Sequence, residues 1–346
     1  MTGARLGSGL AALLAALAMT VTTAAAAPEY RVLGFDDLDG WAEDDHDAAL
    51  RVFRSTCMDM DAPEWGPICA LAGLQAEGRA FFELFFRPVL IEDGTPALFT
   101  GYFEPELDGA LRPDGRFRFP VYARPDELRD GRLWHSRAEI EAGLLAGRGL
   151  EIAWVDDPVE LFFLQVQGSG RIRLRDGSVI RLGYAGANGH EYRSIGQELI
   201  RRGVYEPHQV SAQVIRNWVR RNPDAGRDLL NHNPSYVFFR RVRGIPASAG
   251  PLGAMNRPVA PLRSVAVDPR YVPLGAPVWI EKGGEAPMHR LMVAQDTGSA
   301  IKGAQRADIF FGTGEGAGRA AGRIRDPGRM IVLMPIETAY TLAPGG

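Results

Sequence analysis

The stretch LMVAQDTGSAIKGAQRADIFF, residues 291–311, decides the fold class, because it holds two apolar, strand-like runs that each carry an aspartate at one edge. Asp296 follows the first run, and Asp308 opens the second. A third aspartate, Asp268, ends a similar run upstream and is followed by proline. Aspartate is seldom fully buried unless it is paired, so core packing does not explain these positions. The pattern indicates a wall of carboxylates, of which at least one takes part in chemistry.

Short β-like runs extend this pattern along the chain. Five of them, separated by Gly and Pro turns, lie at residues 264–267, 277–280, 291–294, 309–311 and 330–333. Five short strands with such turns predict a small barrel. Upstream, we expect strands at 98–103 and 161–166, and a hairpin over 171–182 that turns at Asp176-Gly177. The protein should therefore be mainly β with some helices.

Three segments have helical spacing. Residues 44–86 place apolar side chains three and four residues apart, which predicts helix. Residues 192–202 end at a glycine, and residues 211–221 open on a serine cap and are closed by Pro223. We expect the last two to be helices packed on a barrel.

The first 27 residues have the composition of a secretory signal. Arg5 gives a basic start, residues 10–21 are apolar, and residues 22–27 are small. The apolar stretch is too short for a spanning helix, so we expect cleavage near Pro28. Roughly 320 residues would remain, enough for two domains or for one domain with an insertion. No cysteine lies near the cleavage point, so we expect a soluble periplasmic protein without a lipid anchor, with association to the outer membrane or cell wall left open.

The two cysteines, Cys57 and Cys69, form an even pair in a secreted chain, which favours a disulfide. Neither they nor the six isolated histidines have metal-ligand spacing, so we expect no metal and no cofactor. A net charge of −3 provides no broad basic field for nucleic acid. Nothing in the sequence demands more than a monomer.

Four long motifs resemble the lytic murein transglycosylase A family in order and spacing. They are Thr100-Gly101-Tyr102-Phe103-Glu104-Pro105, Phe162 to Gly170, Gly183 to Gly189, and Asn233 to Phe239. The settings of Asp268, Asp296 and Asp308 are similar to that family's C-terminal three-aspartate (3D) domain. The resemblance covers about Leu98 to Leu333 and departs from the family pattern at Ala307, where many members carry an aromatic residue.

The resemblance implies a double-psi β-barrel built from residues 28–105 and 244–346, with a second β domain inserted over residues 106–243. The substrate groove would run between the two domains. It further implies a peptidoglycan lytic exotransglycosylase, a carbon-oxygen lyase that takes part in cell wall turnover. Such an enzyme cleaves the β-1,4 bond between N-acetylmuramic acid and N-acetylglucosamine and leaves 1,6-anhydro ends. Whether cleavage starts at chain ends or inside the strand stays open, as do partners in a cell-wall enzyme complex.

The resemblance places the catalytic carboxylate on Asp308. Glycoside cleavage requires an acid that protonates the leaving oxygen, and a raised pKa would keep Asp308 protonated near neutrality. A transglycosylase needs no second carboxylate, because the C6 hydroxyl of the sugar attacks C1 and Asp308 then accepts its proton. Asp296 and Asp268 would support this step, although a turn role is favoured for Asp268 because Pro269 follows it.

Further side chains are expected to contact the glycan from strand-like segments, where alternate residues share a face. They are Thr100, Tyr102, Gln165, Gln167 and Ser169. Lys302 is either a substrate contact or a solvent-exposed turn residue. Glu104 is a further candidate for a second carboxylate, but we do not expect it to take part in the reaction.

Two other functions stay open at this stage. The three aspartates would suit Mg²⁺ or Mn²⁺ in a metal-dependent phosphoesterase, because hard cations prefer carboxylate oxygens. Alternatively, the chain is a non-catalytic peptidoglycan-binding protein whose aspartates only contact sugars. Whether the protein is a transglycosylase or a peptidoglycan-binding protein, we expect its partners to be peptidoglycan glycan strands.

Overall fold

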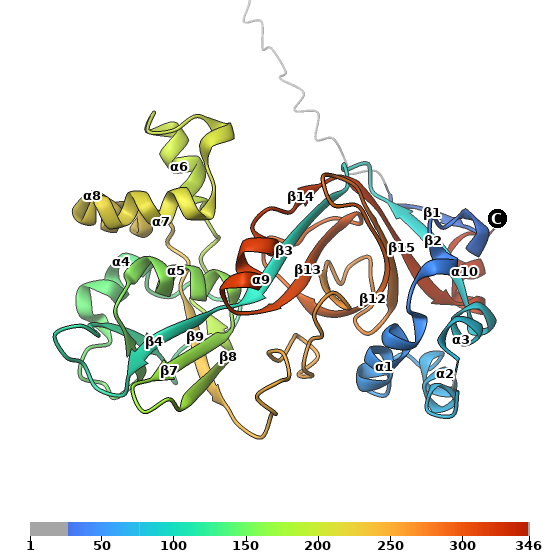
Figure 1. The fold of residues 1–346 in the computed structure, drawn as a ribbon, viewed down its shortest axis with the longest axis horizontal. Coiled ribbons are helices and arrows are strands. Elements are labelled where there is room, and N and C mark those ends of the chain that lie inside the picture. Colours follow the sequence, from blue (N-terminus) through green and yellow to red (C-terminus); the bar gives the residue numbers. More distant parts are fainter. Residues whose placement is uncertain (1–26, 76, 345–346) are drawn as a thin grey trace, which may run out of the picture.

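The computed structural model describes residues 27–75 and 77–344. The expected signal segment therefore lies outside the described residues except for Ala27. Two β-sheets organise the described chain into two lobes that lie side by side (Figure 1). Among the described residues, no helix combines the length and apolar character required to cross a membrane.

The first lobe is built on a nine-stranded sheet that curves into a nearly closed barrel (Figure 1). In spatial order its strands are β1 (Glu29–Val32), β2 (Phe86–Glu92), β15 (Gly328–Pro335), β11 (Pro277–Lys282), β12 (Met288–Thr297), β10 (Ser264–Val267), β13 (Arg306–Thr313), β3 (Leu98–Glu104) and β14 (Arg325–Asp326). The five C-terminal strands expected from the sequence are all present. Their alternate apolar residues fill the barrel, where Val265, Trp279, Val293 and Ile331 are fully buried.

The second lobe is formed by the chain between β3 and β10. Its six-stranded sheet has the order β5 (Phe119–Tyr122), β6 (Glu151–Val155), β4 (Glu106–Ala110), β7 (Gly170–Leu174), β8 (Val179–Ala187) and β9 (Val237–Val242). Strands β7 and β8 are antiparallel and form the hairpin expected at Asp176-Gly177. Strand β3 of the barrel continues through Pro105 into β4 (Figure 1), so the two sheets share one continuous stretch of chain.

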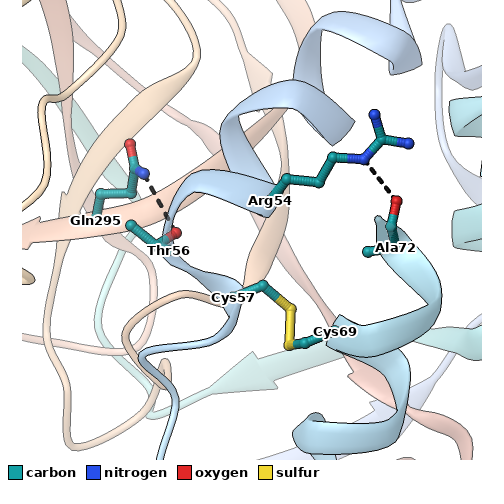
Figure 2. The surroundings of a disulfide bond; sticks show 6 residues. All are labelled: Arg54, Thr56, Cys57, Cys69, Ala72 and Gln295. Atoms are coloured by element: carbon teal, nitrogen blue, oxygen red, sulfur yellow. Dashed lines mark hydrogen bonds between the residues drawn. A yellow bond between two sulfur atoms is a disulfide. The ribbon is translucent and has the colours of Figure 1, made fainter. Parts of the chain in front are cut away.

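Three helices lie within residues 44–86, where the spacing predicts helix, although Phe86 itself begins β2. They are α1 (His46–Cys57), α2 (Trp65–Ala72) and α3 (Gly78–Phe85), and α10 (Ile336–Leu342) lies at the C-terminal end of the chain. Phe53 stands within about 6 Å, centroid to centroid, of the rings of Trp65, Phe81 and Phe82. Figure 2 shows the disulfide between Cys57 and Cys69, which joins the end of α1 to α2.

The strand expected at residues 161–166 is wrong, because these residues lie in helix α5 (Pro158–Gln167). Asp157 caps the helix by accepting from the backbone N–H of Val159, and Pro158 occupies the first turn. Gly168 ends it with a φ of 74°, the left-handed geometry that glycine adopts readily. An apolar run flanked by these cap residues forms a buried helix rather than a strand.

The two expected helices exist as α6 (Ile195–Arg201) and α7 (Ala212–Arg221), but they do not pack on the barrel. Together with α5 they form a separate apolar cluster of the second lobe, which includes Phe162, Leu199 and Val219. Pro223 does not only close α7, because it also begins α8 (Pro223–His232), a helix that the sequence reading missed. The remaining elements are α4 (Arg137–Glu139), α9 (Gly314–Ala321) and the short helices η1 (Phe35–Asp37), η2 (Trp41–Glu43), η3 (Ile140–Leu144) and η4 (Pro207–Gln209).

Candidate active site

Two of the three aspartates lie on either side of strand β10. Asp296 on β12 and Asp308 on β13 are both in register with Ala266, which is buried between them. Residues in register on neighbouring strands project from the same face, and two strand spacings separate the aspartate backbones by about 10 Å. The Ala266 side chain is buried in a small apolar cluster with Tyr102, Ile301 and Phe310.

Asp308 has one carboxylate oxygen in a hydrogen bond. The hydroxyl of Thr100, its register partner on β3, donates to Oδ1 over 2.5 Å. Within the described residues no donor contacts Oδ2. Burial raises the pKa of Asp308, while the Thr100 bond and the positive charge of Arg306 oppose that rise. The group can therefore carry a proton on Oδ2, the oxygen without a protein donor among the described residues.

Asp296 is held by three donors that occupy both of its oxygens. The backbone N–H groups of Ala254 and Thr297 donate to Oδ1 over 3.0 and 2.9 Å, and the Tyr102 hydroxyl donates to Oδ2 over 3.0 Å. Burial raises the pKa of Asp296 to about 6 despite these donors. At neutral pH the group is mostly ionised and fixed in orientation.

Strand β3 supplies both hydroxyl donors because alternate residues share a face. Thr100 and Tyr102, which the sequence predicts as glycan contacts, donate to Asp308 and Asp296 in this structure. The Tyr102 ring packs on Phe310 with centroids 5.1 Å apart. Gly101 faces the other way, where a Cβ atom would stand 2.7 Å from the Cα of Ala321 in α9. The glycine thus lets α9 lie directly against β3, which fixes the strand that carries the two hydroxyls.

The structure does not bring Asp268 to the other two carboxylates. Its side chain is buried and accepts from the Arg270 guanidinium and from the backbone N–H of Gly303. The Arg270 contact holds the pKa of Asp268 at about 2. This geometry is that of a turn anchor, the role that Pro269 favours.

The other expected glycan contacts lie away from the aspartates. Gln165 is buried in α5, and the Gln167 side chain accepts from the backbone N–H of Phe103 over 3.1 Å. Ser169 is buried after the end of α5, and Lys302 is exposed on the turn between β12 and β13. The hydrogen bond of Gln167 links α5 to β3 at Phe103, the residue that follows Tyr102.

Glu104 is fully buried at the end of β3. Its Oε2 accepts from Arg171 over 2.8 Å and from Thr313 over 2.7 Å, and its Oε1 lies 3.6 Å from Arg181. Both arginines also donate to the backbone oxygen of Ala249 in the connector to β10. The carboxylate holds the two lobes and their connector together and is not available to a substrate.

Ala307, the departure from the family pattern, points into the barrel core and is fully buried. It lies on the opposite face of β13 from Asp308, so the departure does not alter the site face. Sequence reasoning missed Arg306, which is two residues before Asp308 and shares its face. The two-residue spacing of Arg306 and Asp308 would have predicted that they share a face of the strand. Nothing in the sequence around Ala254 indicates that its N–H reaches Asp296.

The disulfide region supports the strand that carries Asp296. Gln295 is buried, accepts from the Ser264 hydroxyl, and donates to the hydroxyl of Ser55 in α1 over 3.2 Å. It also donates to the hydroxyl of Thr56 in α1 over 3.3 Å (Figure 2). Arg54 in turn donates to the Ala72 carbonyl over 2.6 Å, which joins α1 to α2 beside the disulfide. Helix α1 therefore sets the position of the residue next to Asp296.

A surface depression of about 660 Å³ lies on the second lobe, lined by Arg124, Tyr184 and Arg240 among others. Arg240 also donates to the Asn256 side chain over 3.1 Å. Asn256 is two residues from Ala254, which contacts Asp296. One turn of the connector thus lies between the depression and the aspartates. Among the described residues, no three acidic, histidine or cysteine side chains converge as metal ligands.

Comparison with known proteins gives matches over both lobes. The MltA specific insert domain matches residues 98–240, and the 3D domain matches residues 263–334. The membrane-bound lytic murein transglycosylase A of Escherichia coli (strain K12) is 40% identical over 259 residues, which is 71% of this chain and 68% of that protein.

Two solved structures have the same fold. The membrane-bound lytic murein transglycosylase from Agrobacterium tumefaciens superposes with a TM-score of 0.82 at 33% identity, over 90% of this chain and 99% of that one. The structure of E. coli MltA with bound chitohexaose gives a TM-score of 0.70 at 31% identity, over 84% and 90% of the two chains. With this identity and coverage, the chain belongs to the membrane-bound lytic murein transglycosylase A family.

Proposed function

We propose that this lytic murein transglycosylase cleaves the β-1,4 bond between N-acetylmuramic acid and N-acetylglucosamine without water, using Asp308 as its single acid and base. The observation that carries the proposal is the unequal use of carboxylate oxygens in the site. Asp308 keeps Oδ2 free of protein donors among the described residues, whereas both oxygens of Asp296 are occupied. One carboxyl group is thus available to a substrate.

The reaction balances with that one group. Protonated Asp308 gives its proton to the glycosidic oxygen as the bond from that oxygen to C1 breaks, and an oxocarbenium-like centre forms at C1. The C6 hydroxyl of the same sugar then attacks C1, and its proton passes to the Asp308 carboxylate. The attack is intramolecular, so it gains from proximity what a hydrolase gains by activating water. The products are a shortened glycan and a 1,6-anhydro end.

Asp296 assists without acting as a second base. An activated water needs a carboxylate oxygen with a free lone pair in reach, and the donors on Asp296 compete for those sites. Its charge at neutral pH lies on the same face as the developing positive centre, where it favours the oxocarbenium-like state. The three-donor shell fixes that charge in place.

The glycan is proposed to run in a groove between a double-psi barrel, residues 28–105 and 244–346, and an inserted domain, residues 106–243. One relative in this family has been solved with bound chitohexaose, a β-linked sugar chain. The turn at Ala254 and Asn256 links Asp296 to the depression around Tyr184 and Arg240. That path is proposed as the route of the strand. The exposed Tyr184 ring offers a surface on which a sugar can stack.

The proposal includes the cellular location and the oligomeric state of the enzyme. We place the mature protein in the periplasm as a monomer that acts on peptidoglycan strands. The disulfide suits an oxidising compartment. Its relatives are named membrane-bound.

The test compares digests of purified peptidoglycan by the wild-type protein, Asp308→Asn and Asp296→Asn. Asp228→Asn serves as the control, because Asp228 is an exposed carboxylate on α8. We expect anhydro products from the wild type and the control, none from Asp308→Asn, and slower formation of the same products by Asp296→Asn. Reducing-end products that vanish in Asp296→Asn would instead make the enzyme a two-carboxylate hydrolase. Intact binding without any product would make it a binding protein.

A further inference from the structure

We propose that Arg306 is a positioning residue for the acid step, because its guanidinium orients the Thr100 hydroxyl toward Oδ1 of Asp308 and so leaves the acid proton on Oδ2. The inference rests on the proposed function, since it concerns the same carboxylate. Arg306, Thr100 and Asp308 lie on one face of the β3–β13 pair, with Thr100 in register with Asp308. The guanidinium donates to Thr100 Oγ1 over 2.8 Å, and Thr100 Oγ1 lies 2.5 Å from Asp308 Oδ1.

The direction of these two bonds follows from the chemistry of the groups. A threonine hydroxyl has one hydrogen and two acceptor lone pairs, whereas an arginine guanidinium only donates. Arg306 must therefore use a lone pair of Thr100, which leaves the hydroxyl hydrogen for Asp308. A proton placed on Oδ1 would meet that hydrogen, so protonated Asp308 carries its proton on Oδ2, the oxygen without a protein donor among the described residues.

Arg306 is itself fixed, which makes it a positioning group rather than a mobile surface charge. Its second terminal nitrogen donates to the backbone oxygens of Ala307 and Leu98, over 2.5 and 3.3 Å. The side chain is partly buried, and burial lowers its pKa although the residue remains a cation. The relay is thus held to the backbones of both strands that form the site.

Three charged or titratable groups interact electrostatically with Asp308, namely Arg306 on β13, Tyr102 on β3 and Asp296 on β12. Arg325 on β14 lies in register with Thr100, and its charge acts on Arg306. Of these, Arg306 alone contacts the hydroxyl that donates to Asp308. Its bond and charge favour the ionised carboxylate, which makes Asp308 a stronger acid at the moment of proton transfer.

The test is the pH dependence of kcat and kcat/KM for release of anhydro products by the mature protein. Activity needs protonated Asp308, so it falls as the pH rises through the pKa of that group. Arg306→Met removes both donor and charge and should move this alkaline limb to higher pH, with kcat about tenfold lower. Arg306→Lys should keep the limb near its wild-type position. Arg319→Gln removes a charge from an exposed ion pair on α9 and should match the wild type.

Thr100→Val keeps the volume of the side chain and removes the relay, so it should also move the limb upward. If circular dichroism shows that Arg306→Met does not fold, the pH profile of Thr100→Val tests the inference instead. Arg306→Met should lower kcat by a smaller factor in the Thr100→Val background than in the wild type, because Arg306 acts through Thr100. An unmoved alkaline limb in these variants, or fully additive effects on kcat, would overturn the inference while wild-type activity stands. If the wild type releases no anhydro product at any pH, the proposed function itself fails.

Discussion

At the scale of single residues, the site is defined by how many donors each carboxylate has. Asp296 accepts three hydrogen bonds and Asp308 one, although both lie on the same face of the barrel sheet. Donors favour the ionised form, and burial favours the neutral form. The difference in donors favours a fixed charge on Asp296, and we propose on this ground that Asp308 carries the transferable proton.

Asp296→Asn should stabilise the protein at alkaline pH. The folded-state pKa of about 6 lies above the 3.8 of an unperturbed aspartate, so ionisation of Asp296 weakens the fold as the pH rises through this range. Asparagine stays neutral, and the free energy of unfolding at pH 8 should therefore rise by about 1–3 kcal/mol. At pH 4 the variant should match the wild type. Urea unfolding at both pH values measures this, with Asp228→Asn as control. An equal effect at both pH values would contradict the pKa assignment.

At the scale of elements, the two faces of strand β3 make different contacts. Thr100 and Tyr102 face the aspartates, whereas Gly101 allows α9 to approach and Glu104 ends the strand in the joint between the lobes. A shift of β3 would move both hydroxyls together. The motif Thr-Gly-Tyr-Phe-Glu-Pro is therefore constrained at almost every position by a different contact.

Gly101→Ala should lower both stability and activity. Its Cβ would stand 2.7 Å from the Cα and 2.9 Å from the carbonyl oxygen of Ala321, and backbone atoms cannot swing away as a flexible side chain can. We expect a loss of about 1–3 kcal/mol in thermal unfolding, with reduced kcat as β3 shifts. Gly66→Ala is the matched control, because no atom lies within 4 Å of a Cβ there and the residue is helical. It should be neutral or stabilising. Equal melting temperatures for the two variants would show that α9 does not depend on close contact at Gly101.

Removal of the disulfide should cost stability more than activity. Cys57 and Cys69 are separated by 12 positions in the sequence, and for a loop of that size the loss of chain entropy corresponds to about 3 kcal/mol. The double variant Cys57→Ser, Cys69→Ser should unfold at correspondingly lower urea concentration and keep most activity at low temperature. Adding dithiothreitol to the wild type should give the same shift and leave the double variant unchanged. A variant that is inactive while fully folded would mean that α1 sets the Asp296 position through the disulfide itself.

The sequence predicts the barrel strands well, because alternating apolar runs between Gly and Pro turns have few other solutions. The same reasoning fails at residues 161–166, where a short apolar run fits strand and helix equally and the cap residues decide. Alternation along the strand predicts that Thr100 and Tyr102 share a face, but only the strand pairing in the structure brings them to Asp308 and Asp296. The backbone donor from Ala254 and the roles of Gln165 and Gln167 could not be predicted, because they depend on contacts between segments far apart in sequence.

At the scale of the whole molecule, one buried cluster joins the two lobes. Glu104 belongs to the barrel sheet, Arg171 and Arg181 belong to the second sheet, and Ala249 lies in the connector between them. All three charged side chains are largely removed from water. The relative position of the lobes, and so the path proposed for the glycan, depends on this contact.

Glu104→Gln should destabilise the protein strongly. Removing one partner of a buried ion pair leaves the other charges uncompensated, which typically costs about 3–5 kcal/mol. Glu127→Gln breaks an exposed pair with Arg148 and should cost less than about 1 kcal/mol. Urea unfolding of both variants measures the difference. Similar small losses would mean that the lobes are held together by other contacts.

The most direct test of the central claim is digestion of peptidoglycan in water enriched in the heavy isotope of oxygen, with mass analysis of every product. If Asp308 is the single acid and the C6 hydroxyl is the nucleophile, the new ends are anhydro sugars that lack one water and carry no heavy oxygen. Asp308→Asn should give no products under the same conditions. Heavy oxygen at the newly formed end would show that water is the nucleophile, and it would contradict the mechanism proposed from the geometry of Asp308 and Asp296.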